Sequence, residues 1–207
     1  MGSLNLADTP SWRAALAQAE ASGWRVAATG DWSWVYRSPE GDRAWRITPF
    51  DPAFRAFIDI CLASSNRHLP RLEGVHEHAE GGYSVIMEWL DPVPEPSAAK
   101  WFDQFEKATD GEIAEARRLL VDAAASIELP LFAGLDKTPA NLLRRQSDGA
   151  YVFTDAFWID GRRLFEMIET RPADALALFS ADSLEHWAHL PCMDTRGTDL
   201  ILRAIGR

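Results

Sequence analysis

The chain is short of cysteine, of basic residues and of long apolar runs. Its 207 residues include two cysteines, Cys61 and Cys192, which cannot build a disulfide framework and favour a reducing compartment. Lys and Arg number 21 against 31 Asp and Glu, a formal net charge of -10. Because this charge repels a phosphate backbone, we expect no nucleic-acid partner. No apolar run approaches the roughly 18 residues of a membrane-spanning helix, so we expect no membrane span and a cytoplasmic protein.

What the sequence does contain is typical of a globular protein. Hydrophobic residues make up 47% and charged residues 25% of the chain, which excludes wholesale disorder. The length suits one domain, or two lobes that share a core. Nine tryptophans are many for this length. We expect most of those in the N-terminal half to fill the core, because large aromatic side chains bury the most apolar surface.

The first 90 residues are predicted to be rich in β-structure. A helix with Thr9 as its N-cap and Pro10 as its first residue should run to about Gly23. Short apolar segments separated by turns then predict an antiparallel meander, a helix that opens at Pro52, and two further strands. The predicted strands cover residues 24–28, 34–37, 44–47, 68–75 and 83–87.

A proline-rich segment, 91–96, follows these strands, and we expect it to lack regular structure and to act as a hinge. Most of the remaining chain is predicted to be helical, apart from a short hairpin over 141–155. The predicted helices cover residues 98–107, 111–127, 161–170, 172–180 and 182–189. We therefore predict a β-rich lobe over 1–90, a hinge over 91–97 and a mainly helical lobe over 98–207.

The segment 134–143 carries the clearest chemical signal. Asp136 precedes Asn141 by five residues, and Pro139 constrains the turn between them. Two apolar strands follow, separated by a polar turn, and then comes Asp155. Read from the residues alone, this pattern places two acids and an amide on loops around a two-stranded ribbon. The alternative is an Asx-rich turn whose side chains only cap backbone amides.

The same pattern resembles the catalytic core of protein kinases and of the related aminoglycoside and choline phosphotransferases. Their catalytic loop reads D-x-K-P-x-N or D-x-x-P-x-N, followed by two strands and a D-F-G or D-P-x. Phosphoryl transfer needs Mg²⁺ held against phosphate oxygens and a hydroxyl aimed in line. The resemblance implies ATP and Mg²⁺ as cofactors, Asp136 as the catalytic base, and Asn141 and Asp155 as metal ligands. It also implies an α+β, two-lobed kinase-like fold whose C-terminal lobe is reduced.

The N-terminal half fits the same resemblance in part. Residues 30–36 lie where the family has its glycine-rich loop, so that Gly30, Ser33 and Val35 become candidate nucleotide-binding residues. Trp32 and Trp34 would then lie in that loop, where one of them could cover adenine or substrate. The segment 86–90 is similar to the fifth strand and hinge, which makes Glu88 and Leu90 further candidates through their backbone.

The chain departs from the family at three positions. Arg46 stands where the family has its phosphate-binding lysine. Arginine keeps the positive charge of lysine, but its guanidinium group is bulkier and donates hydrogen bonds in a different geometry. The usual glutamate partner on the following helix is missing. Asp59 is the one acid in that helix, and we interpret it as solvated because it lies off the apolar face. Lys137 follows Asp136 directly instead of one residue later, and we expect it to reach a phosphate.

We therefore expect a minimal ATP- and Mg²⁺-dependent kinase that acts on a Ser/Thr hydroxyl of a protein. The chain after Trp158 is short for the substrate-enclosing insert of aminoglycoside phosphotransferases, which places a small-molecule acceptor second. A pseudokinase that binds or inhibits without turnover is the main rival, and an unrelated α+β domain is a third reading. The missing activation segment resembles the minimal kinases among bacterial effectors, in which case the protein would act in a host cell's cytoplasm.

Two histidine pairs have spacings that metal sites also use. His76 and His78 flank Glu77, but no third ligand lies nearby in sequence, so a solvated loop is the preferred reading. His186 and His189 lie about one helical turn apart, and we expect them on an exposed or interfacial helix.

Overall fold

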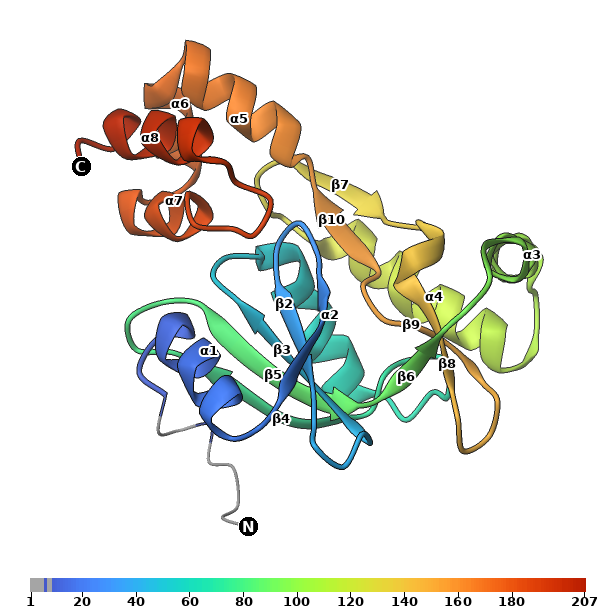
Figure 1. The fold of residues 1–207 in the computed structure, drawn as a ribbon. Helices are drawn as coiled ribbons and strands as arrows, with labels where there is room; N and C mark the ends of the chain where they lie inside the picture. Colours follow the sequence, from blue (N-terminus) through green and yellow to red (C-terminus); the bar gives the residue numbers. More distant parts are fainter. Residues whose placement is uncertain (1–5, 7–8) are drawn as a thin grey trace. The chain divides into compact units, whose positions relative to one another are not determined.

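The computed structural model describes Leu6 and residues 9–207, and it has an α+β architecture (Figure 1). The predicted order of an antiparallel sheet, one helix after its third strand, and a helical region with a hairpin is present. In chain order the elements are α1 (Trp12–Ala21), β1 (Arg25–Thr29), β2 (Trp34–Arg37), β3 (Arg43–Thr48), α2 (Pro52–Ala63), β4 (Leu72–Glu77), β5 (Tyr83–Glu88), β6 (Leu90–Pro92), α3 (Glu95–Lys107), α4 (Gly111–Ser126), β7 (Phe132–Leu135), β8 (Leu142–Arg145), β9 (Tyr151–Phe153), β10 (Phe157–Ile159), α5 (Gly161–Thr170), α6 (Pro172–Leu178), α7 (Ala181–Trp187) and α8 (Thr195–Ala204).

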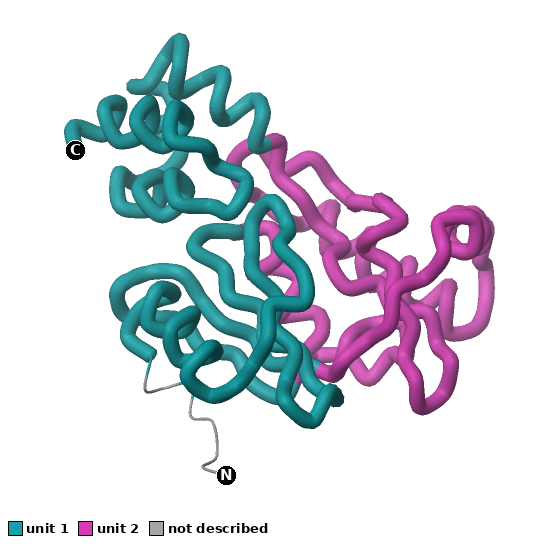
Figure 2. The backbone as a smooth tube through the Cα atoms, viewed as in Figure 1, with its two compact units in different colours: residues 1–51, 73–87, 161–207 teal, residues 52–72, 88–160 magenta. Residues whose placement is uncertain are grey.

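Backbone contacts divide the chain into two compact units (Figure 2). The sheet unit comprises Met1–Asp51, Glu73–Met87 and Gly161–Arg207, and the hairpin unit comprises Pro52–Leu72 and Glu88–Asp160. This division differs from the predicted lobes, because α2 groups with the hairpin unit and the four last helices group with the sheet unit. The boundary at 91–97 remains a proposal about functional lobes. Within the described residues, no helix is long and apolar enough to cross a membrane.

The sheet unit is built on a five-stranded sheet in the order β1-β2-β3-β5-β4. One face of its central strands packs against α1, because alternate residues of β2 and β3 point to that side. Helix α1 begins two residues later than predicted, at Trp12 instead of Pro10. Ser11 is its N-cap, and its hydroxyl accepts the Ala14 N–H at 3.2 Å. Buried members of this core are Trp12, Ala15, Ala19, Trp24, Tyr36, Trp45, Ile47 and Ile86.

The hairpin unit contains the β8–β9 hairpin, which was predicted from its apolar strands and polar turn. The expectation of an irregular 91–96 segment is wrong. Strand β6 pairs with β8 as far as the Pro92–Leu143 pair, and α3 begins at Glu95. Proline is tolerated at both places, because Pro92 ends a short edge strand and Pro96 lies in the first helical turn, where N–H groups lack helical partners.

Two features of the C-terminal half were not predicted. Strands β7 and β10 pair antiparallel, with Leu135 opposite Phe157 and Gly134 opposite Trp158. Phe157 is 2% exposed and packs edge-on against Phe57 of α2, with ring centroids 5.9 Å apart. Helix α8 follows a turn at residues 191–194, and Asp194 caps it by accepting the Gly197 N–H at 2.7 Å.

A buried arginine joins the β8–β9 hairpin to the end of β5. Arg145 is 2% exposed, and it donates from Nε and Nη2 to the two carboxylate oxygens of Glu88 at 2.7 and 2.6 Å. It also donates to the carbonyl oxygens of Arg67 and Leu69 at 2.7 and 3.1 Å. These bonds to Glu88 raise the pKa of Arg145 above its ordinary value. A guanidinium this deep needs such partners, because an unpaired buried charge is costly.

We predict that Arg145→Met lowers the free energy of unfolding by about 3 kcal/mol or more, since it leaves Glu88 without its partner. Arg144→Met is the matched control. Arg144 is exposed on the same strand, and its loss should change stability by less than about 0.5 kcal/mol. Urea denaturation of both variants measures the difference. Equal losses would contradict the role assigned to the Arg145–Glu88 pair.

Candidate active site

Two backbone hydrogen bonds bring the predicted catalytic residues of the hairpin unit together. The Asp136 N–H donates to the Ala156 carbonyl at 2.9 Å, which extends the β7–β10 ladder by one pair. The Thr154 N–H donates to the Asn141 carbonyl at 2.8 Å, which extends the β8–β9 ladder in the same way. Asp155 lies between Thr154 and Ala156. The loop of Asp136 and Asn141 is therefore fixed against both neighbours of Asp155.

Thr138 orients the carboxylate of Asp136. The Thr138 backbone N–H and hydroxyl both donate to Oδ1 of Asp136, at 3.1 and 2.5 Å. No described residue donates to Oδ2, and Asp136 itself is partly exposed. The local geometry therefore leaves one carboxylate oxygen for an outside hydroxyl, which is what a general base needs. Sequence reasoning did not find this role for Thr138.

Asn141 and Asp155 present oxygen atoms suited to a hard cation. The Asn141 side-chain amide donates through Nδ2 to the Asp136 carbonyl at 3.3 Å, which turns its Oδ1 away from that bond. The Oδ1 atom of Asp155 is buried. Two protein oxygens suit Mg²⁺, which usually takes its remaining ligands from water and phosphate. Among the described residues no cluster of three His, Cys, Asp or Glu side chains could hold a metal, so a cation here would depend on Asn141, on Asp155 and on a phosphate.

Lys137 points toward α3 in this structure. Its ammonium group contacts Oε1 of Glu106 at 2.5 Å, and both side chains are 44% exposed. A pair this exposed contributes little to stability and exchanges readily with other partners. The predicted contact of Lys137 with a phosphate would require it to leave Glu106.

In the sheet unit, Arg46 and Val35 lie on one face of the sheet. They are directly opposite each other in the β2–β3 ladder, so their side chains share the face opposite α1. Arg46 is 7% exposed, and its Nη2 donates to Oδ2 of Asp51 at 2.8 Å. Sequence reasoning missed this partner. Asp51 lies in the turn after β3, whereas the search for a partner considered only the acids of the following helix.

Asp59 makes a different ion pair. Its carboxylate accepts from Arg55 at 2.6 Å, one helical turn earlier on α2, and the Asp59 side chain is 67% exposed. The interpretation of Asp59 as a solvated surface residue is consistent with this pair.

The β1–β2 loop contains the predicted glycine-loop residues. The Gly30 N–H donates to the Ser33 carbonyl at 3.0 Å and closes the loop, and Ser33 is 5% exposed. Trp34 stacks on Trp12 with ring centroids 5.7 Å apart, so it belongs to the core beneath α1. Trp32 instead stacks on Phe50, with centroids 6.2 Å apart.

The C-terminal helices also contact this loop within the sheet unit. The Cys192 N–H donates to the Asp31 carbonyl at 3.3 Å. Phe179 packs edge-on against Phe50, with ring centroids 5.5 Å apart, and Phe50 also stacks with Trp32. At Gly161 an added Cβ would come within 2.9 Å of the Trp32 ring. The loop is thus held by chain that lies more than 120 residues later in the sequence.

Glu88 and Leu90, the predicted adenine-contacting residues, have structural partners in the hairpin unit. The Glu88 carboxylate binds Arg145, and its backbone N–H donates to the Arg71 carbonyl at 3.1 Å. Leu90 pairs with Arg145 in the β6–β8 ladder. Their assignment to nucleotide binding therefore stays a prediction, and the Glu88 N–H already has an acceptor.

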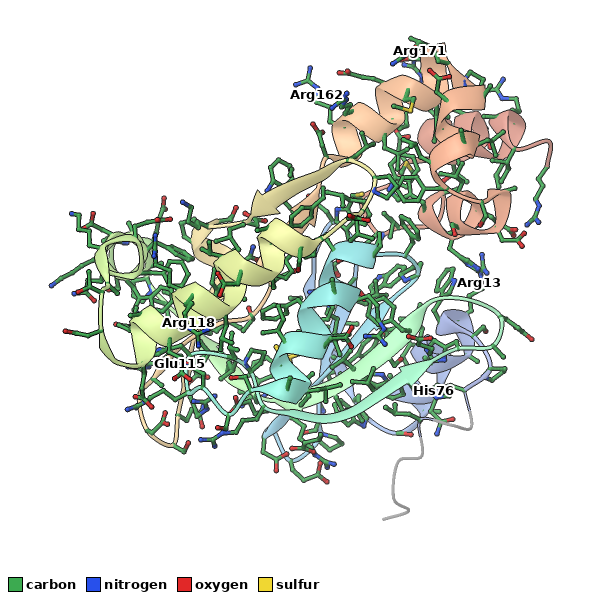
Figure 3. All side chains as sticks on the ribbon, turned by 180° about the vertical axis from the view of Figure 1, so that it is seen from behind. Arg13, His76, Glu115, Arg118, Arg162 and Arg171 are labelled. Carbon is green, nitrogen blue, oxygen red and sulfur yellow. The ribbon has the colours of Figure 1, made fainter. Side chains whose placement is uncertain are left out.

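In each histidine pair one ring has a hydrogen-bond partner within the protein. The expectation of a solvated loop at His76 and His78 is wrong, because His76 lies in β4 and His78 is 5% exposed. His78 contacts the Thr9 carbonyl and the Ser84 hydroxyl through its two ring nitrogens, at 2.8 and 3.0 Å, and burial lowers the pKa of His78. His186 accepts from the Trp12 indole N–H at 3.3 Å. Burial, and then the charge of Arg13 on α1, lower the pKa of His186, and a metal cation would meet the same repulsion from Arg13 (Figure 3).

Comparisons with known proteins found similarities to solved structures. No protein-family model and no curated protein matches the chain. A chain of the CAK complex from Chaetomium thermophilum bound to ATP-γ-S is 15% identical with a TM-score of 0.42. That match covers 71% of this chain and 50% of the other, so this chain spans half the length of that relative.

Two further solved structures are similar over more of their length. The PknI kinase domain of Mycobacterium tuberculosis is 15% identical, with a TM-score of 0.39, over 89% of this chain and 95% of that one. The aminoglycoside phosphotransferase APH(3'')-Id of Streptomyces rimosus is 16% identical, with a TM-score of 0.37, over 92% and 88%. All three TM-scores lie below 0.5, and the function is therefore argued from the chain's own residues.

We predict that Gly134→Ala lowers the free energy of unfolding by about 1–2 kcal/mol, because Gly134 has a φ of 98°, which L side chains rarely adopt. No atom lies within 4 Å of an added Cβ, so the loss comes from backbone strain alone. Gly30→Ala is the control. It has no such φ, its nearest contact would be 3.8 Å, and its effect should stay below about 0.5 kcal/mol. Thermal or urea unfolding compares the two, and an unchanged Gly134→Ala variant would contradict the strain argument.

Proposed function

We propose that the protein is an ATP- and Mg²⁺-dependent phosphotransferase. The observation that carries the proposal is that two backbone hydrogen bonds hold the loop of Asp136 and Asn141. The Asp136–Ala156 and Asn141–Thr154 hydrogen bonds gather Asp136, Asn141 and Asp155 at one end of the two ribbons. A turn whose acids only capped backbone amides would not need a second acid there. Asp136 instead keeps one oxygen to which no described residue donates.

Each residue has a role in the proposed transfer. Asp136 would accept the proton of the attacking hydroxyl through Oδ2 and hold that hydroxyl in line. Asn141 and Asp155 would bind Mg²⁺, which neutralises charge on the phosphate oxygens when it is bound. Arg46 would contact phosphate, since a guanidinium can donate to two phosphate oxygens at once. Gly30, Ser33 and Val35 would line the nucleotide from the sheet.

The proposed acceptor is a Ser or Thr hydroxyl of a protein. The helices of residues 161–207 group with the sheet unit. In that unit Cys192 contacts the β1–β2 loop, and Phe179 packs on Phe50, which stacks with Trp32 of that loop. These helices are therefore no part of the hairpin unit that carries Asp136, which supports a protein as the source of the hydroxyl. A small-molecule hydroxyl is the less favoured acceptor.

A pseudokinase is the second candidate, and a specific observation favours it. In nucleotide-binding proteins, loops that cover phosphates need to move as ligand enters. Here Trp32 and Asp31 of the loop are held by Phe50 and Cys192 within the sheet unit. A chain that binds a partner without turnover would tolerate such a fixed loop.

The test is phosphoryl transfer from radiolabelled MgATP to a mixture of Ser- and Thr-containing peptides and to the protein itself. We predict that Asp136→Asn reduces the transfer rate by about 100-fold or more, as expected for loss of a general base. Asp122→Asn should keep the wild-type rate, since Asp122 is 68% exposed and, among the described residues, pairs with Arg118 of its own helix.

The outcomes separate the candidates. Transfer by the wild type that is lost in Asp136→Asn supports the phosphotransferase. Equal transfer by both proteins would overturn the role of Asp136. Binding of MgATP by the wild type without any transfer would favour the pseudokinase.

A further inference from the structure

Arg46 and Asp51 form a buried ion pair inside the sheet unit. The two side chains are 9% and 8% exposed, and the Nη2–Oδ2 distance is 2.8 Å. The Arg46 Nε also lies 3.4 Å from the Thr48 hydroxyl. Removing two charges from water is unfavourable unless the pair is well aligned, so this sequence commits both residues to one geometry.

The turn that carries Asp51 is itself anchored to the sheet. The Tyr83 hydroxyl on β5 donates to the Asp51 backbone carbonyl at 2.9 Å, and Tyr83 is 6% exposed. Asp51 follows the end of β3 by three residues, and β3 and β5 are neighbours in the sheet. The backbone of Asp51 is thus held by its neighbours β3 and β5, and it directly precedes Pro52, the first residue of α2.

The one acid within α2, Asp59, is 67% exposed and pairs with Arg55 one helical turn earlier. It therefore serves as a control for the removal of an acid outside the Arg46–Asp51 pair.

We propose that Asp51 is the positioning residue for Arg46, and that the turn after β3 orients the phosphate-contacting guanidinium through this ion pair. This inference rests on the proposed function, because it assumes that Arg46 meets a nucleotide phosphate. It assigns to Asp51 no contact with the nucleotide itself. Its consequence is that the affinity for a nucleotide phosphate depends on the Asp51 carboxylate.

The first experiment compares calorimetric titrations of the full chain with MgATP and with adenosine. Asp51→Asn should weaken MgATP binding at least tenfold and leave adenosine binding within twofold, because only the phosphates meet Arg46. Asp51→Glu keeps the carboxylate and should recover most of the MgATP affinity. Asp59→Asn is the matched control and should bind both ligands like the wild type.

A purely structural role predicts a different pattern. If Asp51 only stabilised the fold, Asp51→Asn would weaken MgATP and adenosine equally, and this result would overturn the proposal. Unchanged MgATP binding would overturn it as well. If the wild type binds adenosine but MgATP no more tightly, then Arg46 does not contact phosphate and the proposed function fails first. The two failures are therefore distinguishable.

A second measurement covers the case in which Asp51→Asn does not fold. The wild-type chain is labelled with ¹⁵N-arginine, and the Arg46 Nε–H signal is assigned with Arg46→Lys. In Asp51→Glu this signal should shift, and in both proteins MgATP should move it while adenosine leaves it unchanged. An Arg46 signal that is insensitive to Asp51→Glu, or that MgATP does not move, would contradict the proposal.

Discussion

The Arg145 guanidinium is the buried charge around which the hairpin unit is organised. It is 2% exposed and donates to both carboxylate oxygens of Glu88 and to two backbone carbonyls near the start of β4. Three segments that are far apart in the chain therefore meet at one side chain. Because β8 leads directly from Asn141, this ion pair also fixes the base of the ribbon that carries the candidate metal ligands. Breaking the Arg145–Glu88 pair would disturb the candidate site through β8, although Arg145 itself contacts no ligand in the proposed mechanism.

The sheet unit also contains a buried ion pair, at a different position in the fold. The Arg46–Asp51 pair is equally buried, but it lies on the sheet face opposite α1, next to Val35. Each unit thus holds one half of the proposed machinery with its own ion pair. Arg46, the proposed phosphate contact, and the residues of the β1–β2 loop belong to the sheet unit. The proposed base and the proposed metal ligands belong to the hairpin unit.

Local patterns in the sequence predicted the local parts of this structure. The pattern around Asp136, Asn141 and Asp155 predicted a loop followed by a two-stranded ribbon, because turn chemistry and strand periodicity act over few residues. The partners of Arg46 and Arg145 could not be found in that way. Glu88 lies 57 residues from Arg145, and no periodicity links them. The irregular hinge was predicted from proline alone, and it failed because Pro92 occupies an edge strand, where its missing N–H costs nothing.

The most direct test of the central claim is a calorimetric titration with ATP, in the presence and absence of Mg²⁺, on the wild type and on Asp155→Ala. The account predicts binding by the wild type that depends on Mg²⁺, and loss of that dependence in Asp155→Ala while the variant stays folded. Binding that is identical in both proteins would contradict the metal assignment. Absence of binding by the wild type would contradict the proposal that this fold serves a nucleotide.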